Sequence, residues 1–573
     1  MSSTNSSQTA LSQHGRQPEK KSTEKPRQHS SSSSDDGTLR DLPAGTKVNK
    51  DNVPTYMGLS GSNLIWAITV ASSFGFGLFV PPFACPQDQG VMSGIISAPQ
   101  FFRTFPHLDP ANEGDYQSSV MQAFYVAIYE VGCLVGALFA LWKGDFLGRR
   151  RMMQVASYVM MVGVAIQVTA FRGHEAEAQF IIGRIVTGLG NGMNTATIPT
   201  WHAETAKSHN RGLLVCIEAA MISTGTAISY WIDYGFSFID SSVSWRVPIA
   251  SQVVFAICLL ALVHFLPESP RWLVAHGNLA EAQRVVAALE PAPFHSAEVI
   301  GQTRVILESI ESDKQNRGIA DLITNGPTQH LRRMLLGASS QFMQQIGGCN
   351  AVIYFAPVIF EQNLSLGRNL SLILGAVNVT VYALSAVLAF FTVERVGRRK
   401  LFLIGSAGQA ASMFIIMGCV YAGDDQSLKG AVFGLFLFLV FFGFTWLQLP
   451  WLYPAEINPL KTRTRANAVS TVTNWIWNFA VVMFTPPMLS AINGSTFLFF
   501  GVINLCFIPP IYFFYPETAG RSLEEIDIIF AKGYVEQQWY VKVSKELPSL
   551  SYSEIQGEWQ RLGLGNEPLD ERV

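Results

Sequence analysis

The stretch GDFLGRR, at residues 144–150, decides the fold because the chain contains it in two versions. The second version is ERVGRR at 394–399, and its Gly-Arg-Arg comes 249 residues after the first. An acid, Asp145 or Glu394, precedes each glycine at similar spacing. Since an acid and an arginine on a tight glycine turn can pair, we interpret both turns as salt-bridge latches between helix ends, which can favour one conformation. Anchoring of positive charge on one side of a membrane is the alternative.

Two further landmarks repeat at nearly the same spacing. PES at 267–269 returns as PET at 516–518, again 249 residues on, and AE at 203–204 returns at 455–456, 252 residues on. The glutamate of each AE is followed seven residues later by an arginine. These repeats predict two copies of one unit in parallel topology. Two such halves around a site at the membrane midplane are typical of secondary transporters that work by rocking.

The composition places these copies in a membrane. Of 573 residues, 49% are hydrophobic and only 14% are charged, whereas soluble proteins have about 25% charged residues. There are too few charges to cover the surfaces of several soluble domains. The net charge of -2 argues against nucleic-acid binding through a basic face. The chain is therefore expected to be a helical membrane protein with several spans.

Twelve apolar runs are long enough to cross about 30 Å of hydrocarbon. Backbone groups inside lipid must be satisfied within the segment, so the runs are expected to be helices. They lie near 61–96, 119–142, 152–171, 178–203, 212–234, 245–266, 334–360, 370–393, 400–422, 430–454, 466–490 and 495–515. We predict an all-α membrane protein of twelve transmembrane helices in two six-helix halves with a cytosolic helical linker. The predicted parts are a disordered cytosolic tail (1–58), the N-terminal half (59–266), the linker (267–333), the C-terminal half (334–516) and a polar cytosolic tail (517–573).

Charged loops orient the protein. Lys and Arg gather in loops on one side of the twelve-span arrangement, and this side is expected to be cytoplasmic. Both tails and the linker fall on the same side, with the plasma membrane the expected location. Apolar spacing predicts short amphipathic helices at 279–290 and 297–311 of the linker. Asn363 and Asn369 each begin a glycosylation sequon in an external loop.

No sequence pattern indicates an enzyme or a metal site. The seven cysteines are spread singly through apolar segments, with no CxxC or Cys/His cluster. We found no nucleophile–base–acid set in the sequence. The expectation is therefore a non-enzyme without a cofactor, working as a monomer in the lipid bilayer.

At this point the motifs resemble a known family, the sugar porters of the major facilitator superfamily. The resemblance covers about residues 60–530. It is carried by GDFLGRR (144–150), GRIVTGLGNG (183–192), PESPRWL (267–273), QQIGGCN (344–350), ERVGRR (394–399) and PETAGRSLEEI (516–526). The stretches PTWHAETAKSHNRG (199–212) and LPWLYPAEINPLKTRTRA (449–466) look like a fungal branch that includes hexose carriers and glycerol- or polyol-proton symporters. The implied substrate is a small neutral sugar or polyol.

A sugar site needs amides that donate and accept, plus aromatic rings that stack on the sugar. The resemblance assigns substrate contacts to Gln344, Gln345, Asn350, Tyr354, Asn378, Trp446 and Asn474. Hydrogen bonding between helices, or core packing, is the alternative for each of them. Gly347 and Gly348 can let the seventh span bend as a gate.

Two positions depart from the hexose pattern. The usual Trp-Gly-Pro is missing, and Gln448 follows Trp446 by two residues. Many members carry a glutamine where this chain has Ala219, next to Glu218. A carboxylate inside the membrane is a functional candidate that can bind hydroxyls, take a proton or cap a helix contact. The loss of that glutamine fits a smaller or more flexible polyol somewhat better than glucose, and Gln448 can alter the selectivity.

Proton coupling is implied by a second pair of positions. In proton-coupled sugar porters an aspartate of the first helix pairs with the arginine of the GRxxxGxGxG helix, and Asp88 and Arg184 match these positions. Paired with the cation the acid is charged, and separated from it the acid takes a proton. Residues 80–87, rich in proline, stand before Asp88 where the family has two residues, which disturbs the register. We interpret them as an error of splicing or gene prediction rather than a genuine bulge.

The resemblance also implies a cytosolic latch of acids and arginines. Its candidates are Asp145, Arg149, Glu204, Arg211, Glu268, Arg271, Glu394, Arg398, Glu456, Arg463 and Glu517. Solvated loop ends are the alternative. The sequence thus predicts proton-coupled import of a monosaccharide or polyol by alternating access, with the proton as the coupling ion. A passive facilitator and a non-transporting nutrient sensor are the competing interpretations.

Overall fold

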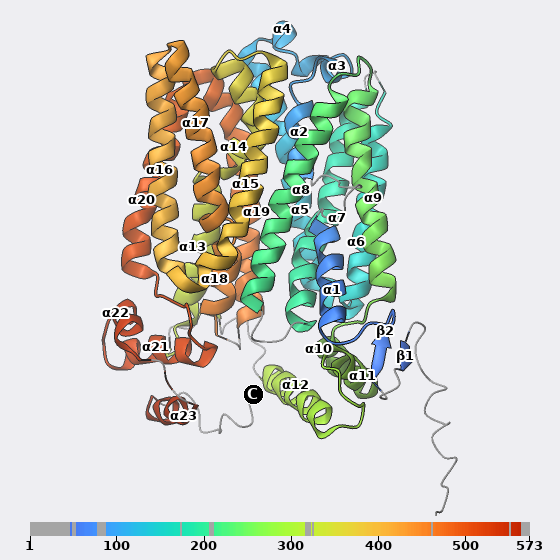
Figure 1. Cartoon of the computed structure of the whole chain (residues 1–573), viewed down its shortest axis with the longest axis vertical. Helices are drawn as coiled ribbons and strands as arrows, with labels where there is room; N and C mark the ends of the chain where they lie inside the picture. Colours follow the sequence, from blue (N-terminus) through green and yellow to red (C-terminus); the bar gives the residue numbers. More distant parts are fainter. Residues whose placement is uncertain are drawn as a thin grey trace, which may run out of the picture. The chain divides into compact units, whose positions relative to one another are not determined.

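The computed structural model describes residues 46–48, 53–76, 88–171, 175–205, 211–315, 322–323, 326–459, 462–548, 550 and 552–562. All of them belong to one compact unit, 45–573. Figure 1 shows their helices, coloured along the sequence from blue to red. Segment 80–87, whose origin the sequence leaves in question, lies outside the described residues.

The N-terminal half contains six spans. In the first, α1 and α2 are described and the residues between them are not, and the others are single long helices. Short helices α3 (Pro99–Phe102), η1 (Pro106–Leu108) and α4 (Pro110–Glu113) connect the first span to the second. The spans are α1 (Ser62–Phe76) with α2 (Asp88–Ile95), α5 (Asp115–Leu147), α6 (Arg149–Val168), α7 (Ala176–Thr205), α8 (Arg211–Phe236) and α9 (Val243–Phe265).

The C-terminal half repeats this plan. Its first span is broken at Gly348, whose φ of 91° is left-handed and whose missing Cβ would lie 2.6 Å from the Phe500 ring. The predicted bend at the paired glycines is therefore present. The spans are α13 (His330–Ile346) with α14 (Cys349–Val358) and the π-turn η4 (Ile359–Asn363), α15 (Arg368–Val396), α16 (Arg398–Ala422), α17 (Asp425–Phe441) with η5 (Phe442–Trp446) and α18 (Leu449–Ile457), α19 (Arg463–Ile492), and α20 (Ser495–Phe514).

Eight of the described helices are each long and apolar enough to cross a bilayer alone. The other four spans are α1 with α2, the broken pair α13–α14, and α7 and α8, which carry buried polar side chains. The two halves meet where α5 packs against α19, α8 against α15 and α2 against α14 (Figure 1). The fold is thus the predicted twelve-helix arrangement in two six-helix halves.

Glycine permits a close helix contact between α5 and α7 of the N-terminal half. A Cβ on Gly188 of α7 would lie 2.2 Å from the Tyr129 carbonyl oxygen of α5, and one on Gly192 would lie 2.0 Å from the Cys133 carbonyl oxygen. Small residues at such contacts let backbones approach, which is how helices associate in lipid. The glycines of GRIVTGLGNG therefore set the distance between α5 and α7.

The linker and the tails are more structured than the sequence predicted. The linker holds α10 (Pro270–Ala275), α11 (Leu279–Leu289) and α12 (Ala297–Gln315), so both expected linker helices are present. The tail assigned to 1–58 is not disordered throughout, because strands β1 (Thr46–Val48) and β2 (Pro54–Tyr56) pair antiparallel. Tyr56 is buried in a cluster with Ala282 and Val285 of α11, which gives the hairpin a surface to fold against.

The tail after 516 also differs from the expected polar end. It forms α21 (Leu523–Val535), α22 (Tyr540–Glu546) and α23 (Tyr552–Arg561). Ile526, Ile529 and Phe530 of α21 are buried in the large hydrophobic core, which contains residues of both halves. Asp527 pairs with the fully buried Arg333 of α13, with its Oδ1 2.5 Å from Nη2. An apolar face on an otherwise polar segment explains the difference.

Replacing Gly188 with leucine is expected to prevent correct packing of α7 against α5, because the new side chain has no space beside Tyr129. Overpacking of this kind costs about 1–3 kcal/mol or more. Thermal unfolding of the detergent-purified protein measures the loss. Gly418→Leu is the matched control, since nothing lies within 4 Å of a Cβ there. Equal melting temperatures for the two variants would contradict the close contact.

Candidate functional site

A network of buried amides occupies the C-terminal half. The amide nitrogen of Gln344 donates to the Trp446 carbonyl at 2.7 Å, and its oxygen accepts from Asn474 at 3.1 Å. Asn474 also donates to the amide oxygen of Gln341 at 2.6 Å. These contacts join α13, α19 and the turn η5 that precedes α18. Two predicted residues, Gln344 and Asn474, are thus brought together, with Gln341 as an unpredicted third member.

The network continues beyond the break at Gly348. Asn350 of α14 donates to the Gln345 amide oxygen at 2.7 Å and to Asn478 of α19 at 2.6 Å. One turn further on, the Tyr354 hydroxyl donates to Glu130 of α5 at 3.0 Å. This last bond crosses from the C-terminal half to the N-terminal half. We call these three groups together the polar seam; its members are Glu130, Gln341, Gln344, Gln345, Asn350, Tyr354, Asn474 and Asn478.

The other two predicted substrate residues lie apart from these hydrogen bonds. Asn378 of α15 is fully buried, and neither its amide oxygen nor its nitrogen has a partner in the described part of the chain. Trp446 packs against Phe402 and Phe507, with ring centroids 4.8 and 5.7 Å away, and its indole nitrogen also has no described partner. A buried amide left unsatisfied costs about 1–3 kcal/mol, so both groups have unused capacity to bind a ligand.

The amide nitrogen of Gln448 already has hydrogen-bond acceptors within the protein. That nitrogen donates to the carbonyls of Ala386 at 3.2 Å and Gly443 at 2.9 Å. Both acceptors are backbone groups of α15 and η5. The side chain stabilises the irregular turn before α18.

Arg184 is buried between α7 and α5. Its guanidinium donates to the carbonyls of Tyr125 at 3.2 Å and Val126 at 3.1 Å, and it lies 4.7 Å from the centre of the Tyr129 ring. Only 1% of the residue is exposed. The expected partner, Asp88, begins α2, but its side chain lies outside the described residues. The predicted Asp88–Arg184 pair therefore stays a prediction.

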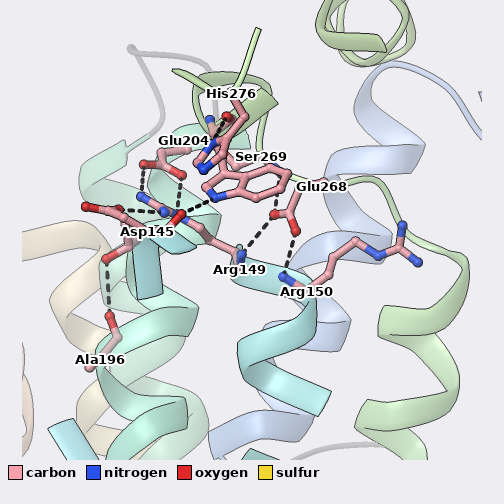
Figure 2. Close-up of polar contacts among 10 residues, drawn as sticks. Asp145, Arg149, Arg150, Ala196, Glu204, Glu268, Ser269 and His276 are labelled. Carbon is pink, nitrogen blue, oxygen red and sulfur yellow. Dashed lines mark hydrogen bonds and ion pairs between the residues drawn. The ribbon is translucent and has the colours of Figure 1, made fainter. Parts of the chain in front are cut away.

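The first latch joins four helix ends of the N-terminal half. Figure 2 shows Arg149 between Asp145 and Glu204. Its guanidinium lies 3.0 Å from each carboxylate. Glu268 accepts from the backbone N–H groups of Arg149 and Arg150, at 3.1 and 3.0 Å, and so caps the start of α6. Burial raises the pKa of the Glu268 carboxyl, and hydrogen bonds from Ser269 and Arg150 oppose this change.

The second latch has the same construction. Arg398 pairs with Glu394 and Glu456, each at 2.6 Å. Glu517 accepts from the backbone N–H groups of Arg398 at 2.8 Å and Arg399 at 3.2 Å, and so caps α16. A Cβ on Gly397 would lie 2.5 Å from the Glu517 carboxylate, and its φ of 93° is left-handed. Glycine therefore precedes the arginines because the capping carboxylate needs that space.

Three other latch candidates have different positions. Arg463 donates to the Asn458 carbonyl at 3.2 Å, within its own half. Arg271 lies in α10, partly exposed. The side chain of Arg211 lies outside the described residues. In the described ranges, no group of three or more His, Cys, Asp or Glu side chains could hold a metal ion.

Comparison of the chain with family models and with known proteins identifies its family. Residues 81–530 match the model of the sugar (and other) transporter family. The chain belongs to this family. The sugar transporter STL1 of Saccharomyces cerevisiae is 44% identical over 519 residues, which cover 90% of this chain and 90% of that protein. The major facilitator superfamily transporter mfsA of Aspergillus fumigatus is 43% identical over 515 residues, covering 89% of this chain and 94% of that protein.

Solved structures agree on the fold. The proton:xylose symporter XylE bound to 6-bromo-6-deoxy-D-glucose superposes with a TM-score of 0.68 at 24% identity, covering 82% of this chain and all of that one. The E. coli xylose transporter XylE in a partially occluded inward open conformation gives a TM-score of 0.67 at 23% identity, covering 80% of this chain and all of that one. This family member therefore has the major facilitator fold.

Sequence reasoning missed three members of the polar seam in this transporter. Glu130 is the single charged residue in the apolar run 119–142. A lone acid inside a predicted span is by itself a sign of a functional residue. Asn478 lies four residues after Asn474 and so shares its helix face. Gln341 precedes the QQ pair by one helical turn. Each carried a recognisable signal, but none matched a family motif.

Substituting Arg398 by lysine is expected to destabilise the transporter, because an ammonium cannot bind Glu394 and Glu456 through a planar fork. Hydrogen bonds to charged groups contribute about 1.5–3 kcal/mol each. Thermal unfolding in detergent checks the loss. The exposed Arg395→Lys serves as the matched control. A melting temperature for Arg398→Lys as high as that of the control would contradict the role of this latch.

Proposed function

We propose that this transporter imports a small neutral sugar or polyol together with protons, by alternating access, across the plasma membrane with both termini in the cytosol. The observation that carries the proposal is the polar seam. It offers amides and hydroxyls in the membrane interior and connects the two halves through Tyr354 and Glu130. A neutral polyhydroxy compound needs such groups and no fixed counter-charge.

The proposed substrate contacts are the seven residues that the sequence identified. Gln344, Gln345, Asn350, Tyr354 and Asn474 lie in the polar seam, where a ligand hydroxyl can replace one of the present hydrogen bonds. Asn378 and Trp446 supply an amide and an indole nitrogen that have no described partner. The relatives named sugar transporter, galactose transporter and high-affinity hexose transporter support a sugar-like substrate.

Contacts between the halves support alternating access. At the end opposite to the latches, Arg368 of α15 donates to the Ser97 carbonyl at 2.5 Å, and Ser119 lies 2.6 Å from Ser490 between their hydroxyls. In the same region the Tyr230 hydroxyl donates to the Ile353 carbonyl. These bonds hold the external end together and must break for a substrate to enter from outside. We propose that residues 59–266 and 334–516 rock as two bodies around the polar seam.

The proposed coupling pair is Asp88 and Arg184. A carboxylate beside Arg184 stays charged, and its separation from the guanidinium in a water-poor site favours proton uptake. A proton that crosses 100 mV gains about 2.3 kcal/mol, which corresponds to roughly fifty-fold accumulation of a neutral substrate. XylE, a proton:xylose symporter with the same fold, supports this coupling.

Radiolabelled uptake in a host without its own carriers tests the proposal. Glucose, xylose, a disaccharide and glycerol are compared at an acidic and a neutral external pH, with and without a protonophore. We expect accumulation of one substrate class, faster at acidic pH and abolished by the protonophore. Uptake that stops at equal internal and external substrate concentrations, and that the protonophore does not change, identifies a passive facilitator. A complete lack of uptake, with altered signalling in Arg184 variants, identifies a sensor.

Removing the Gln345 side chain is expected to weaken substrate binding, because Asn350 loses a partner and the ligand loses an amide. A loss of about 1–2 kcal/mol raises KM roughly 5- to 30-fold. Initial uptake rates of Gln345→Ala measure the change against Gln426→Ala, whose helix position at the start of α17 lies far from the seam along the chain. An unchanged KM at equal surface expression would exclude the seam as the substrate site.

A further inference from the structure

A second buried polar group lies in the N-terminal half, apart from the polar seam. Nδ1 of His202, on α7, lies 2.5 Å from Oε1 of Glu218, on α8. The other ring nitrogen, Nε2, lies 2.9 Å from the Thr69 hydroxyl on α1. The side chains of His202 and Glu218 are only 2% and 9% exposed. Three helices thus converge on one buried histidine.

The hydrogen bonds allow two arrangements of the protons, because the roles of the ring nitrogens depend on the tautomer. Thr69 either donates to the Ile65 carbonyl, 2.9 Å away, and accepts from a protonated Nε2, or donates to Nε2 itself. In the first arrangement the contact between Nδ1 and Glu218 holds one further proton, and the pair is neutral overall. In the second arrangement Nδ1 carries the proton and Glu218 is a carboxylate, so the pair has one negative charge. The neutral arrangement suits a site inside the membrane.

Loss of one proton would leave the pair with a net negative charge. The remaining proton of His202 would then bridge Nδ1 and the Glu218 carboxylate, with Thr69 donating to Nε2. Because burial away from water penalises that charge, the closed site favours the protonated pair, and hydration of the site favours loss of the proton. Protonation of the pair and its exclusion from water thus favour each other, as two linked equilibria must.

The position of the pair places it near the cytosol. Glu218 and Thr69 each come seven residues after the start of their helices, at Arg211 and Ser62, a distance of about 10 Å along a helix. His202 is three residues before the end of α7. Helix α8 also packs against α15 of the other half, so it borders the path that rocking would open.

Other titratable groups at this end are largely paired with each other. Helix α1 has no titratable residue between Ser62 and Phe76. On α7, Glu204 is bound by Arg149. Cys216 of α8 faces the Arg398 latch, in which Glu394 and Glu456 are already bound. The further groups at this end of packed elements are Lys143, Asp145, Arg150, Arg151, His264, Arg271, Glu281, Arg284 and Arg395.

We propose that His202 and Glu218, held by Thr69, form a second protonatable site of the transport cycle, which releases its proton to cytosolic water when the halves part at that side. The proton leaves the shared position between Nδ1 and Oε1 as hydronium, and an external proton restores it in a later step of the cycle. This inference rests on the proposed proton-coupled import. The sequence indicated Glu218 alone, and the structure supplies its partner.

The test separates coupling from transport. Glu218→Gln keeps a hydrogen-bonding side chain but cannot release a proton. It is expected to retain exchange of external labelled against internal unlabelled substrate, using whichever of glucose, xylose or glycerol the wild-type protein accumulates. The ratio of internal to external substrate concentration should fall towards one. In the wild-type protein a potential of 100 mV alone can raise this ratio to roughly fifty. The dependence of uptake on cytosolic pH should disappear as well.

A second variant and a control complete the experiment. Thr69→Val removes the hydroxyl partner of His202 with little change in volume, and it is expected to shift the pH profile of uptake while exchange persists. His107→Gln, in the exposed pair of His107 and Glu113 at 2.8 Å, is the matched control and should behave as wild type.

Two results would overturn this inference. One is wild-type accumulation and pH dependence in Glu218→Gln. The other is a raised KM in both uptake and exchange with an unchanged pH profile, which would make Glu218 a substrate ligand. Wild-type uptake that ignores a protonophore would instead refute proton coupling itself, and that result does not involve the variants.

Discussion

A polar group in hydrocarbon has no water to bind, so a large polar side chain there is costly unless it finds a partner elsewhere in the protein. This constraint organises the whole structure. It explains why Asn350 binds Gln345 and Asn478, why Arg184 takes two backbone carbonyls of α5, and why His202 meets both Glu218 and Thr69. Each such contact ties together helices that apolar packing alone would hold loosely. A sugar hydroxyl or a proton can replace one of these same hydrogen bonds. One set of polar groups therefore both holds the helices together and binds what is transported.

The latches show this principle at the membrane surface. In each half one arginine binds two acids, and one glutamate caps the first two N–H groups of the next helix. The capping carboxylate forces glycine at 148 and 397, because any side chain there would meet it. The repeated unit therefore has the same contacts between helix ends in both halves, built from the same sequence motifs. These contacts keep each half together as one body, which rocking requires.

Much of this structure could be predicted from local sequence patterns. The spans, the bend at Gly348 and the two latches follow from hydropathy and from motifs that repeat within the chain. The partners inside the membrane do not follow in this way. Tyr354 and Glu130 are 224 residues apart, and no periodicity of either helix indicates which side chain it will face. Glu218 was recognisable as an acid in an apolar run, whereas His202 stood only as part of a motif at a helix end. The hairpin at 46–56 and the helices after 522 were missed because their apolar faces are short and lie within polar segments.

The central claim is that a neutral substrate and protons cross together through the polar seam. The most direct measurement uses the purified full-length protein in liposomes with an interior pH indicator and an inside-negative potential. Addition of the transported sugar or polyol outside should acidify the interior, at an initial rate that saturates with the same KM as entry of labelled substrate. Entry of labelled substrate without any acidification would contradict the claim.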